Sequence, residues 1–198
     1  MLFGATLLRP AVSGCANFVQ NKASTPIRFA LQTIPFRLET DETLNIPHAP
    51  TTMAGGVAVF DCNQDGRPDI FFTNGANIAS LKKDMPKYSN RLFRNDGNGV
   101  FTDVTDRAGL AGRGYDNGVA VGDYDNDGYP DLFVTGVHGR TLYHNNGDGT
   151  FSDVTVKSHL DSWNDPDYGP LWSVAAGWVD VNNDGWLDLF VVNYLRWE

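Results

Sequence analysis

The feature that most constrains the fold of this 198-residue chain is a nine-residue acidic segment that occurs three times. The copies span residues 61–69, 123–131 and 180–188, and we refer to them as acidic loops 1, 2 and 3. Each has oxygen-bearing side chains at positions 1, 3, 5 and 9 and a glycine at position 6. That glycine allows a sharp turn, which folds position 5 back toward position 1. Such a loop suits a hard cation, and its repetition predicts an array of similar units.

A second repeated segment alternates with the acidic loops. The fourteen residues that begin at Leu92 match the fourteen that begin at Leu142, 50 residues later. The acidic loops themselves are 62 and 57 residues apart, because a 12-residue insert lies in the first interval and a 7-residue insert in the second. Both intervals therefore reduce to 50 residues, and a fixed period near that value predicts a propeller or a solenoid.

Short apolar segments around acidic loop 2 predict β-strands. Strands are expected at residues 118–123, 131–135, 141–145 and 151–155. Phe151 and Val154 are expected core residues, and Asn146–Gly149 carries turn-forming residues. No helical period is sustained in these units. Four strands in 50 residues make one propeller blade, so we predict an all-β partial propeller of four-stranded antiparallel blades.

The predicted domain organisation has two parts. Residues 1–34 are expected to form a leader or a disordered segment, and residues 35–198 an incomplete propeller of about 2.5 blades. The blades are expected at about 55–105, 118–155 and 174–198. Phe36–Thr40 is expected to be a ring-closing strand of a last blade whose other strands lie outside this sequence. The chain would then be an N-terminal fragment of a longer propeller.

The acidic loops predict up to three Ca²⁺ sites. Side-chain oxygens at positions 1, 3, 5 and 9 and the carbonyl oxygen of position 7 can surround an ion that takes six to eight oxygen ligands. Mg²⁺ fits less well, because it prefers a rigid octahedron that retains several waters. The predicted ligand residues are Asp61, Asn63, Asp65, Arg67, Asp69, Asp123, Asp125, Asp127, Tyr129, Asp131, Asp180, Asn182, Asp184, Trp186 and Asp188.

An EF-hand and a plain hairpin turn are the two alternatives to this cation site. An EF-hand needs a bidentate Glu at position 12, whereas position 12 is Phe72, Val134 and Val191 in the three copies, so the EF-hand is rejected. A single copy could be a plain Asp/Asn/Gly-rich hairpin turn, but three copies in register argue against that reading. Acidic loop 2 has four carboxylates and the others three, so we predict that loop 2 binds Ca²⁺ most tightly, with affinities of roughly 10⁻⁴–10⁻³ M.

The segments GVAVFDCNQDGRPDIFF, GVAVGDYDNDGYPDLFV and AAGWVDVNNDGWLDLFV resemble FG-GAP/VCBS repeats. The interleaved RLFRNDGNGVFTDVT and TLYHNNGDGTFSDVT are similar to bacterial exported proteins of the VCBS/ASPIC-UnbV type, relatives of cartilage acidic protein. The resemblance covers about residues 36–198. It implies an integrin-α-type β-propeller, with Ca²⁺ bound by the loop positions named above. It says little about function, because such propellers serve adhesion, carbohydrate binding and enzyme scaffolding alike.

The two inserts, at residues 76–88 and 161–171, extend loops on the blade face opposite the acidic loops. Loops on a rigid scaffold often carry recognition, so a protein or glycan ligand is expected on that face. Trp163, Tyr168 and Trp172 could stack on a sugar ring or anchor a protein. The alternative is that these aromatic side chains only cover the junction between blades.

Composition and motifs narrow the function. The net charge of −9 argues against a nucleic-acid partner. The sequence contains no apolar run of 18 residues, so no transmembrane span is expected. The four histidines are scattered and no nucleophile motif is present, so we expect a non-enzymatic protein. The leading prediction is a calcium-binding extracellular module for recognition or adhesion. The alternatives are the scaffold domain of a secreted enzyme, such as a polysaccharide lyase, and a purely structural spacer.

The N-terminus bears on location. Val12–Cys15 resembles a bacterial lipoprotein cleavage site. However, Arg9-Pro10 interrupts the apolar stretch before this site, and no Lys or Arg precedes that stretch, as a signal peptide would require. An extracytoplasmic location is expected, with anchoring at Cys15 as a weaker alternative. Cys62, at position 2 of acidic loop 1, is expected to point away from a bound ion.

Overall fold

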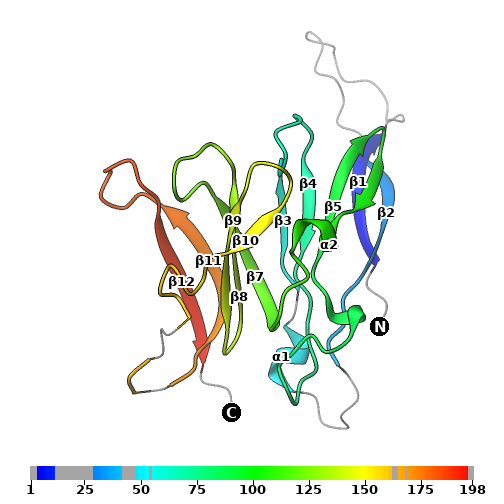
Figure 1. Cartoon of the computed structure of the whole chain (residues 1–198). Coiled ribbons are helices and arrows are strands. Elements are labelled where there is room, and N and C mark those ends of the chain that lie inside the picture. Colours follow the sequence, from blue (N-terminus) through cyan, green and yellow to red (C-terminus); the bar gives the residue numbers. More distant parts are fainter. Residues whose placement is uncertain are drawn as a thin grey trace, which may run out of the picture. The chain divides into compact units, whose positions relative to one another are not determined.

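The computed structural model describes residues 4–11, 29–41, 48–53, 55–161, 165–167 and 169–195 (Figure 1). The chain divides into two compact units, Met1–Arg37 and Leu38–Glu198. In the first unit, strand β1 pairs with β2 in an antiparallel two-stranded sheet. These strands lie partly within the range expected to be a leader, and the leader itself stays a prediction. The bounds are Gly4–Ala11 for β1 and Phe29–Arg37 for β2.

The ring-closing strand expected at Phe36–Thr40 is not formed as predicted. Phe36 and Arg37 end strand β2, whose partner is β1 rather than a blade. The residues that follow adopt no strand, and their polar groups bond to the first blade instead: the Glu39 N–H donates to Asn74 Oδ1 (2.8 Å). The prediction rests on the distance in sequence between Phe36 and acidic loop 1, and that distance does not distinguish pairing with a blade from pairing with β1.

The first blade is a four-stranded antiparallel sheet in the order β3-β4-β5-β6. Its strands are β3 (Val57–Phe60), β4 (Asp69–Phe72), β5 (Arg91–Gly97) and β6 (Val100–Asp103). Acidic loop 1 joins β3 to β4. This four-stranded sheet lies within the range, about 55–105, at which the first blade is expected.

The second blade repeats this topology, with acidic loop 2 between its first two strands. Its strands are β7 (Tyr115–Gly122), β8 (Asp131–Val137), β9 (Arg140–Asn145) and β10 (Phe151–Asp153). Strands β11 (Trp172–Val179) and β12 (Asp188–Leu195) form an antiparallel pair around acidic loop 3. One residue pair, Trp172 with Val137, joins this third pair to β8. The predicted all-β architecture is thus confirmed, with β7 starting before the expected residue 118.

The helical elements among the described residues are single turns. They are α1 (Ala49–Thr52), the 3-10 turn η1 (Pro86–Tyr88) and α2 (Thr105–Ala108). Helix α2 ends at Gly109, whose φ of 76° is left-handed and suits glycine. No helix in the described part of the chain is long and apolar enough to span a membrane.

The main core lies between the first two blades. Strand β3 alternates exposed and buried residues, and its buried Ala58 and Phe60 face the second blade. Phe60 meets Phe151 edge to face, with ring centroids 6.4 Å apart, so the expectation that Phe151 is a core residue is confirmed. The buried members of this cluster are Ala58, Phe60, Cys62, Phe71, Leu92, Ala108, Leu110, Leu132, Val134, Tyr143 and Phe151.

Equivalent residues of the first two units show the same blade-to-blade packing. Phe71, Phe133 and Phe190 occupy the same register, two residues after position 9 of their acidic loops. Phe71 and Phe133 are each 0 % exposed, because another unit follows, whereas Phe190 in β12 is 65 % exposed. At the junction of the second and third units, a Cβ on Gly122 would lie 2.5 Å from Trp178 Cδ1. Glycine at this position therefore makes room for the Trp178 ring.

The first insert, residues 76–88, packs against the blades around a buried lysine. Lys83 has only 3 % of its side chain exposed, and its ammonium lies 3.4 Å from Asp116 Oδ2 at the start of β7. Burial lowers the pKa of Lys83 and raises the pKa of Asp116, and their mutual attraction opposes both shifts. The Lys83 ammonium also donates to the backbone carbonyls of Asn74 (2.6 Å), Gly75 (2.8 Å) and Tyr88 (2.8 Å).

Candidate cation-binding loops

The three acidic loops share one hydrogen-bond frame. In each, the carboxylate at position 1 accepts the backbone N–H groups of positions 5 and 6. For Asp61 the two distances are 3.1 and 2.7 Å, for Asp123 3.0 and 2.8 Å, and for Asp180 3.1 and 2.9 Å. This frame folds position 5 back toward position 1 in all three copies, as the sequence predicts.

The carboxylates at positions 5 and 9 are also fixed by backbone donors. Position 5 accepts the N–H of position 7, at 2.9, 2.8 and 2.9 Å in loops 1, 2 and 3. Position 9 accepts the N–H of position 2, at 2.9, 3.2 and 3.0 Å. In the first two loops a strand of the same blade adds a second donor, since the Asn95 N–H bonds to Asp69 and the Asn145 N–H to Asp131. Most carboxylate oxygens of the loops are therefore held in place before any ion binds.

Two residues of each loop have left-handed backbone. The glycine at position 6 has φ of 79°, 92° and 88° in the three copies. Position 4 also has positive φ, at 57°, 58° and 57°, and is occupied by Gln64, Asn126 and Asn183. Asn is among the residues that tolerate this conformation best. Position 6 was recognised from the sequence, whereas position 4 was not.

Position 3 carries the strongest sign that the loops are suited to bind a ligand. The side-chain atoms Asn63 Oδ1 and Asp125 Oδ1 are buried and have no hydrogen-bond partner. A buried acceptor without a partner costs about 1–3 kcal/mol, so such oxygens normally face a water or an ion. In loop 3 the corresponding oxygen, on Asn182, accepts the Asp184 N–H at 3.1 Å. Loops 1 and 2 therefore each leave one buried oxygen free for a cation.

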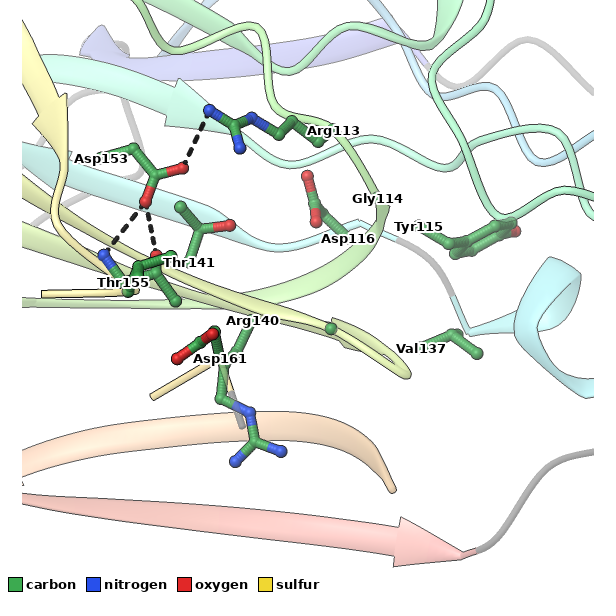
Figure 2. A pocket seen from close by; sticks show the side chains of 12 residues that line it. Arg113, Gly114, Tyr115, Asp116, Val137, Arg140, Thr141, Asp153, Thr155 and Asp161 are labelled. Atoms are coloured by element: carbon green, nitrogen blue, oxygen red, sulfur yellow. Dashed lines mark hydrogen bonds and ion pairs between the residues drawn. The ribbon is translucent and has the colours of Figure 1, made fainter. Parts of the chain in front are cut away.

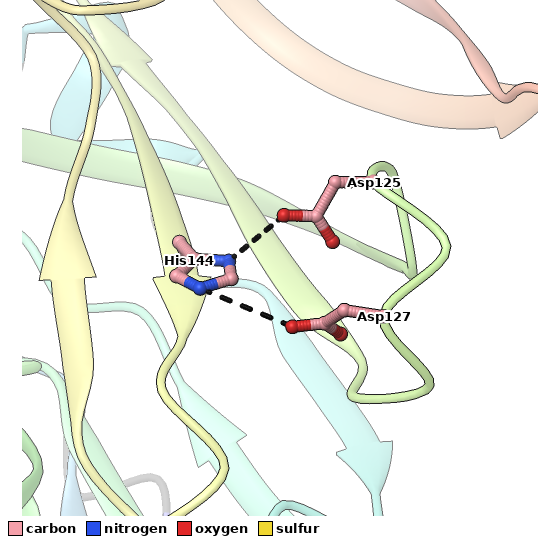
Figure 3. Close-up of side chains that lie close together, drawn as sticks. All are labelled: Asp125, Asp127 and His144. Atoms are coloured by element: carbon pink, nitrogen blue, oxygen red, sulfur yellow. Dashed lines mark ion pairs between the residues drawn. The ribbon is translucent and has the colours of Figure 1, made fainter.

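Acidic loop 2 gathers the most ligand atoms. Carboxylate oxygens of Asp123, Asp125 and Asp131 all lie within 4.8 Å of one another. Burial raises the pKa of Asp131 to about 6, against hydrogen bonds from backbone N–H groups that lower it. His144, from β9, points at the same loop, with Nδ1 3.2 Å from Asp125 Oδ2 and Nε2 3.9 Å from Asp127 Oδ2 (Figure 3). No feature of the sequence predicted that His144 would lie beside this loop.

Position 2 of loop 1 faces the core between the blades, where the Cys62 thiol also contacts the Asp69 carboxylate, and its orientation relative to a bound ion stays a prediction. Cys62 is buried in the core between the blades, and burial raises the pKa of its thiol. Tyr124, the equivalent residue of loop 2, stacks on Trp178 of the next unit with ring centroids 6.1 Å apart. Position 2 therefore serves packing between units.

A comparison with models of protein families identifies the family to which this chain belongs. A family model described as FG-GAP-like repeat matches residues 61–134 and again residues 124–191. The chain belongs to the FG-GAP-like repeat family. The two matches include all three acidic loops and most of the strands around them, so the resemblance expected from the sequence is confirmed. The positions of the ligands within each FG-GAP-like repeat remain a prediction.

The other comparisons add little to this assignment. A solved structure similar to the FG-GAP-like repeats is that of an Agrocybe aegerita lectin, described by its specific recognition of non-reducing terminal N-acetylglucosamine. The two chains are 24 % identical with a TM-score of 0.37, and the match covers 69 % of this chain and 32 % of the lectin. This chain therefore spans about a third of the lectin's length. No curated protein sequence matches the chain.

Three aromatic residues are expected on the ligand face, and for one of them, Trp172, the prediction is wrong. Trp172 is fully buried, its Nε1–H donates to Asn117 Oδ1 (3.0 Å), and its ring meets Tyr194 edge to face. A side chain with no exposed surface cannot stack on a sugar, so Trp172 packs the junction between units. Trp163 and Tyr168 lie outside the described residues.

A cavity of about 260 Å³ lies at the end of the second blade away from acidic loop 2 (Figure 2). It is bordered by the start of β7 and the turn from β8 to β9, whereas the acidic loop joins the other ends of β7 and β8. Arg113 pairs across it with Asp153 (3.3 Å), which also accepts the Thr155 hydroxyl. Its polar lining includes Arg113, Arg140, Thr141, Asp153 and Asp161.

Sequence reasoning missed two supporting asparagines. Asn95 and Asn145 occupy the same place in the second repeated segment, and each side chain accepts the N–H of the glycine two residues later. Each also donates to the carbonyl of the proline at position 8 of the acidic loop of its own blade, at 3.1 Å in both cases. Their equivalence was visible in the matched segments, but it was attributed to strand and turn formation alone.

Proposed function

We propose that these FG-GAP-like repeats form a Ca²⁺-stabilised, non-enzymatic recognition module that works outside the cytoplasm. The observation that carries the calcium part is the pair of buried, unpartnered oxygens of Asn63 and Asp125 inside loops whose other carboxylate oxygens are mostly hydrogen-bonded. A divalent cation satisfies such oxygens and offsets the repulsion between the carboxylates around them. When bound, the ion would supply positive charge that rigidifies the loop.

The residues present fit Ca²⁺ better than a transition metal. Each loop offers four side-chain oxygens, and the position 7 carbonyls of Arg67, Tyr129 and Trp186 accept no hydrogen bond from the described residues. An oxygen-only set of this size suits the flexible shell of Ca²⁺. The side-chain ligands would be those at positions 1, 3, 5 and 9 of each acidic loop.

The three loops should differ in affinity, with loop 2 the tightest. We expect Asp127→Asn to remove the tightest phase of a calorimetric Ca²⁺ titration, because loop 2 has four carboxylates where the others have three. Asp65→Asn, at the same position 5 of loop 1, should leave that phase intact and remove a weaker one. Both residues accept the N–H of position 7, and Asp65 in addition pairs with Arg67 (2.6 Å), a contact that Asn retains only as a neutral hydrogen bond. Equal losses in the two variants would contradict the ranking.

The recognition part of the proposal is supported by the cavity opposite acidic loop 2. Its volume of about 260 Å³ is close to the lower end of the range of small-molecule sites, which is about 300–1,000 Å³. Arginine donors and carboxylate acceptors line it together, and a ligand rich in hydroxyl groups can use both kinds of partner. We therefore favour a carbohydrate ligand on this face, and a protein ligand is the alternative outcome of the test.

A glycan-array screen tests this site. Arg113 has 82 % of its side chain exposed, so Arg113→Ala should leave the fold intact and reduce glycan binding by about 10-fold, since hydrogen bonds to charged groups contribute about 1.5–3 kcal/mol. Lys157→Ala, an exposed change in the loop after β10 that does not line the cavity, is the matched control. Equal binding by the two variants would contradict the site. Product release from uronic-acid polymers would instead support the lyase-scaffold alternative.

An extracytoplasmic location is proposed because Ca²⁺ sites with the expected affinities of roughly 10⁻⁴–10⁻³ M would be filled where extracellular calcium modules work. The lipoprotein alternative depends on Cys15, which lies outside the described residues. N-terminal sequencing of the protein from fractionated cells separates these possibilities. A modified Cys15 at the N-terminus would support anchoring, and an intact Met1 would exclude it.

A further inference from the structure

Neighbouring acidic loops are connected by the side chain at position 4. Gln64 of loop 1 donates from Nε2 to the carbonyl oxygen of Gly128, which is position 6 of loop 2 (2.7 Å). Asn126 of loop 2 donates from Nδ2 to the carbonyl oxygen of Gly185, position 6 of loop 3 (3.0 Å). The same donor position thus reaches the same acceptor position at both junctions, although one side chain is longer than the other.

The peptide group that accepts each link also orients a predicted ligand. The carbonyl of Gly128 and the N–H of Tyr129 belong to one peptide unit, and that N–H donates to Asp127 Oδ1 at 2.8 Å. At the next junction, the peptide after Gly185 donates through the Trp186 N–H to position 5 of loop 3 at 2.9 Å. A hydrogen bond to one side of a peptide polarises the other side, so position 4 of one loop helps to hold position 5 of the next.

A second contact joins loops 1 and 2. Asn145 donates from Nδ2 to the carbonyl of Cys62 in loop 1 (3.0 Å), and its backbone N–H donates to Asp131 in loop 2 (2.8 Å). The Cys62 N–H in turn bonds to Asp69, position 9 of loop 1. Hydrogen bonds therefore connect position 9 of loop 1 with position 9 of loop 2.

We propose that Gln64 and Asn126 are positioning residues that couple the cation sites of neighbouring loops, so that Ca²⁺ binds cooperatively along the array. This inference rests on the proposed binding of Ca²⁺. An ion bound in one loop would hold the side chains at positions 3 and 5. It would thereby restrict the residue between them, whose side-chain amide makes the link to the next loop. The fixed amide holds the peptide that orients position 5 of the next loop. The second ion would then bind a loop that is already partly ordered, so its binding would cost less conformational entropy.

Calorimetry with Ca²⁺ alone tests the coupling in a background that leaves only loops 2 and 3 active. Asp61→Asn with Asp65→Asn disables loop 1, and this background should bind with a Hill coefficient above one. Asn126→Gly should make the two sites independent and weaken binding by about 2- to 10-fold, the equivalent of one hydrogen bond. Glycine keeps the left-handed backbone accessible, so the change removes only the amide.

Asn183→Gly is the matched control. Asn183 is also at position 4, with φ of 57° against 58° for Asn126, and its side chain donates to no described residue. This variant should bind like the background. A readout without metal is the exchange rate of the Trp186 N–H in EDTA, measured by NMR, which should rise in Asn126→Gly and stay unchanged in Asn183→Gly.

The outcomes separate the two proposals. If the unmodified chain shows no Ca²⁺ binding, the proposed function fails and the coupling of cation sites fails with it. If Ca²⁺ binds but Asn126→Gly and Asn183→Gly give the same affinity and the same Hill coefficient, the coupling is wrong and the calcium proposal stands.

Discussion

EDTA is expected to lower the melting temperature of this chain by about 10–20 °C relative to a sample in about 5 mM Ca²⁺. With a dissociation constant of ~3 × 10⁻⁴ M, each occupied loop stabilises the folded state by about 1.7 kcal/mol at that concentration. Three loops together contribute about 5 kcal/mol, and a chain of this size changes its melting temperature by about 2–4 °C per kcal/mol. Circular dichroism melts with and without EDTA measure the shift.

The control is a variant that cannot use the metal. Changing position 5 in every loop, Asp65→Asn with Asp127→Asn and Asp184→Asn, removes a ligand charge but keeps the side-chain shape. This triple variant should melt near the EDTA value under both conditions. An unmodified chain that melts at the same temperature with and without EDTA would refute the calcium proposal, and an EDTA shift of full size in the triple variant would place the ions elsewhere.

Lys83→Met is expected to destabilise the fold by about 3–5 kcal/mol, the usual cost of removing one partner of a buried ion pair. The change leaves the carboxylate of Asp116 buried without its cation. It also leaves the backbone carbonyls of Asn74, Gly75 and Tyr88 without the donor they now share. Urea unfolding of the Ca²⁺-loaded protein measures the loss as a lower midpoint, with little change in the slope.

The neighbouring lysine provides the control. Lys82 is exposed, so Lys82→Met should change the free energy of unfolding by less than about 0.5 kcal/mol. Adding Asp116→Asn to Lys83→Met should recover part of the loss, because it removes the uncompensated buried charge. Equal unfolding midpoints for Lys82→Met and Lys83→Met would show that the Lys83 contacts contribute nothing to stability.

The repeat explains why much of this fold could be predicted. Three acidic loops in register fix where β3, β7 and β11 end and where β4, β8 and β12 begin, because the same turn must join them. Val57–Phe60 is apolar throughout, so its sequence did not show which face of β3 packs into the core; the structure buries Ala58 and Phe60 and exposes Val57 and Val59. Position 6 was predictable, since glycine is the residue that adopts its left-handed backbone at little cost.

The failures have a common physical cause, which is contact between residues far apart in the sequence. Lys83 resembles a solvated loop residue until the carbonyls around it are seen, and Trp172 resembles an exposed anchor until Asn117 is found to accept its N–H. The Gln64 link joins residues 64 positions apart. Phe36 was assigned to a blade because an extended segment does not reveal its pairing partner.

The links between position 4 and position 6 have a consequence for how such a protein can change its length during evolution. The first and second units each carry the donor for the unit after them, the second and third each carry the acceptor for the unit before them, and the phenylalanine of every unit lies in the same register. An in-frame duplication of the second unit would therefore bring both halves of a working junction with it. Gain or loss of a whole blade by recombination needs no new interface, so the loops on the opposite face are free to diverge.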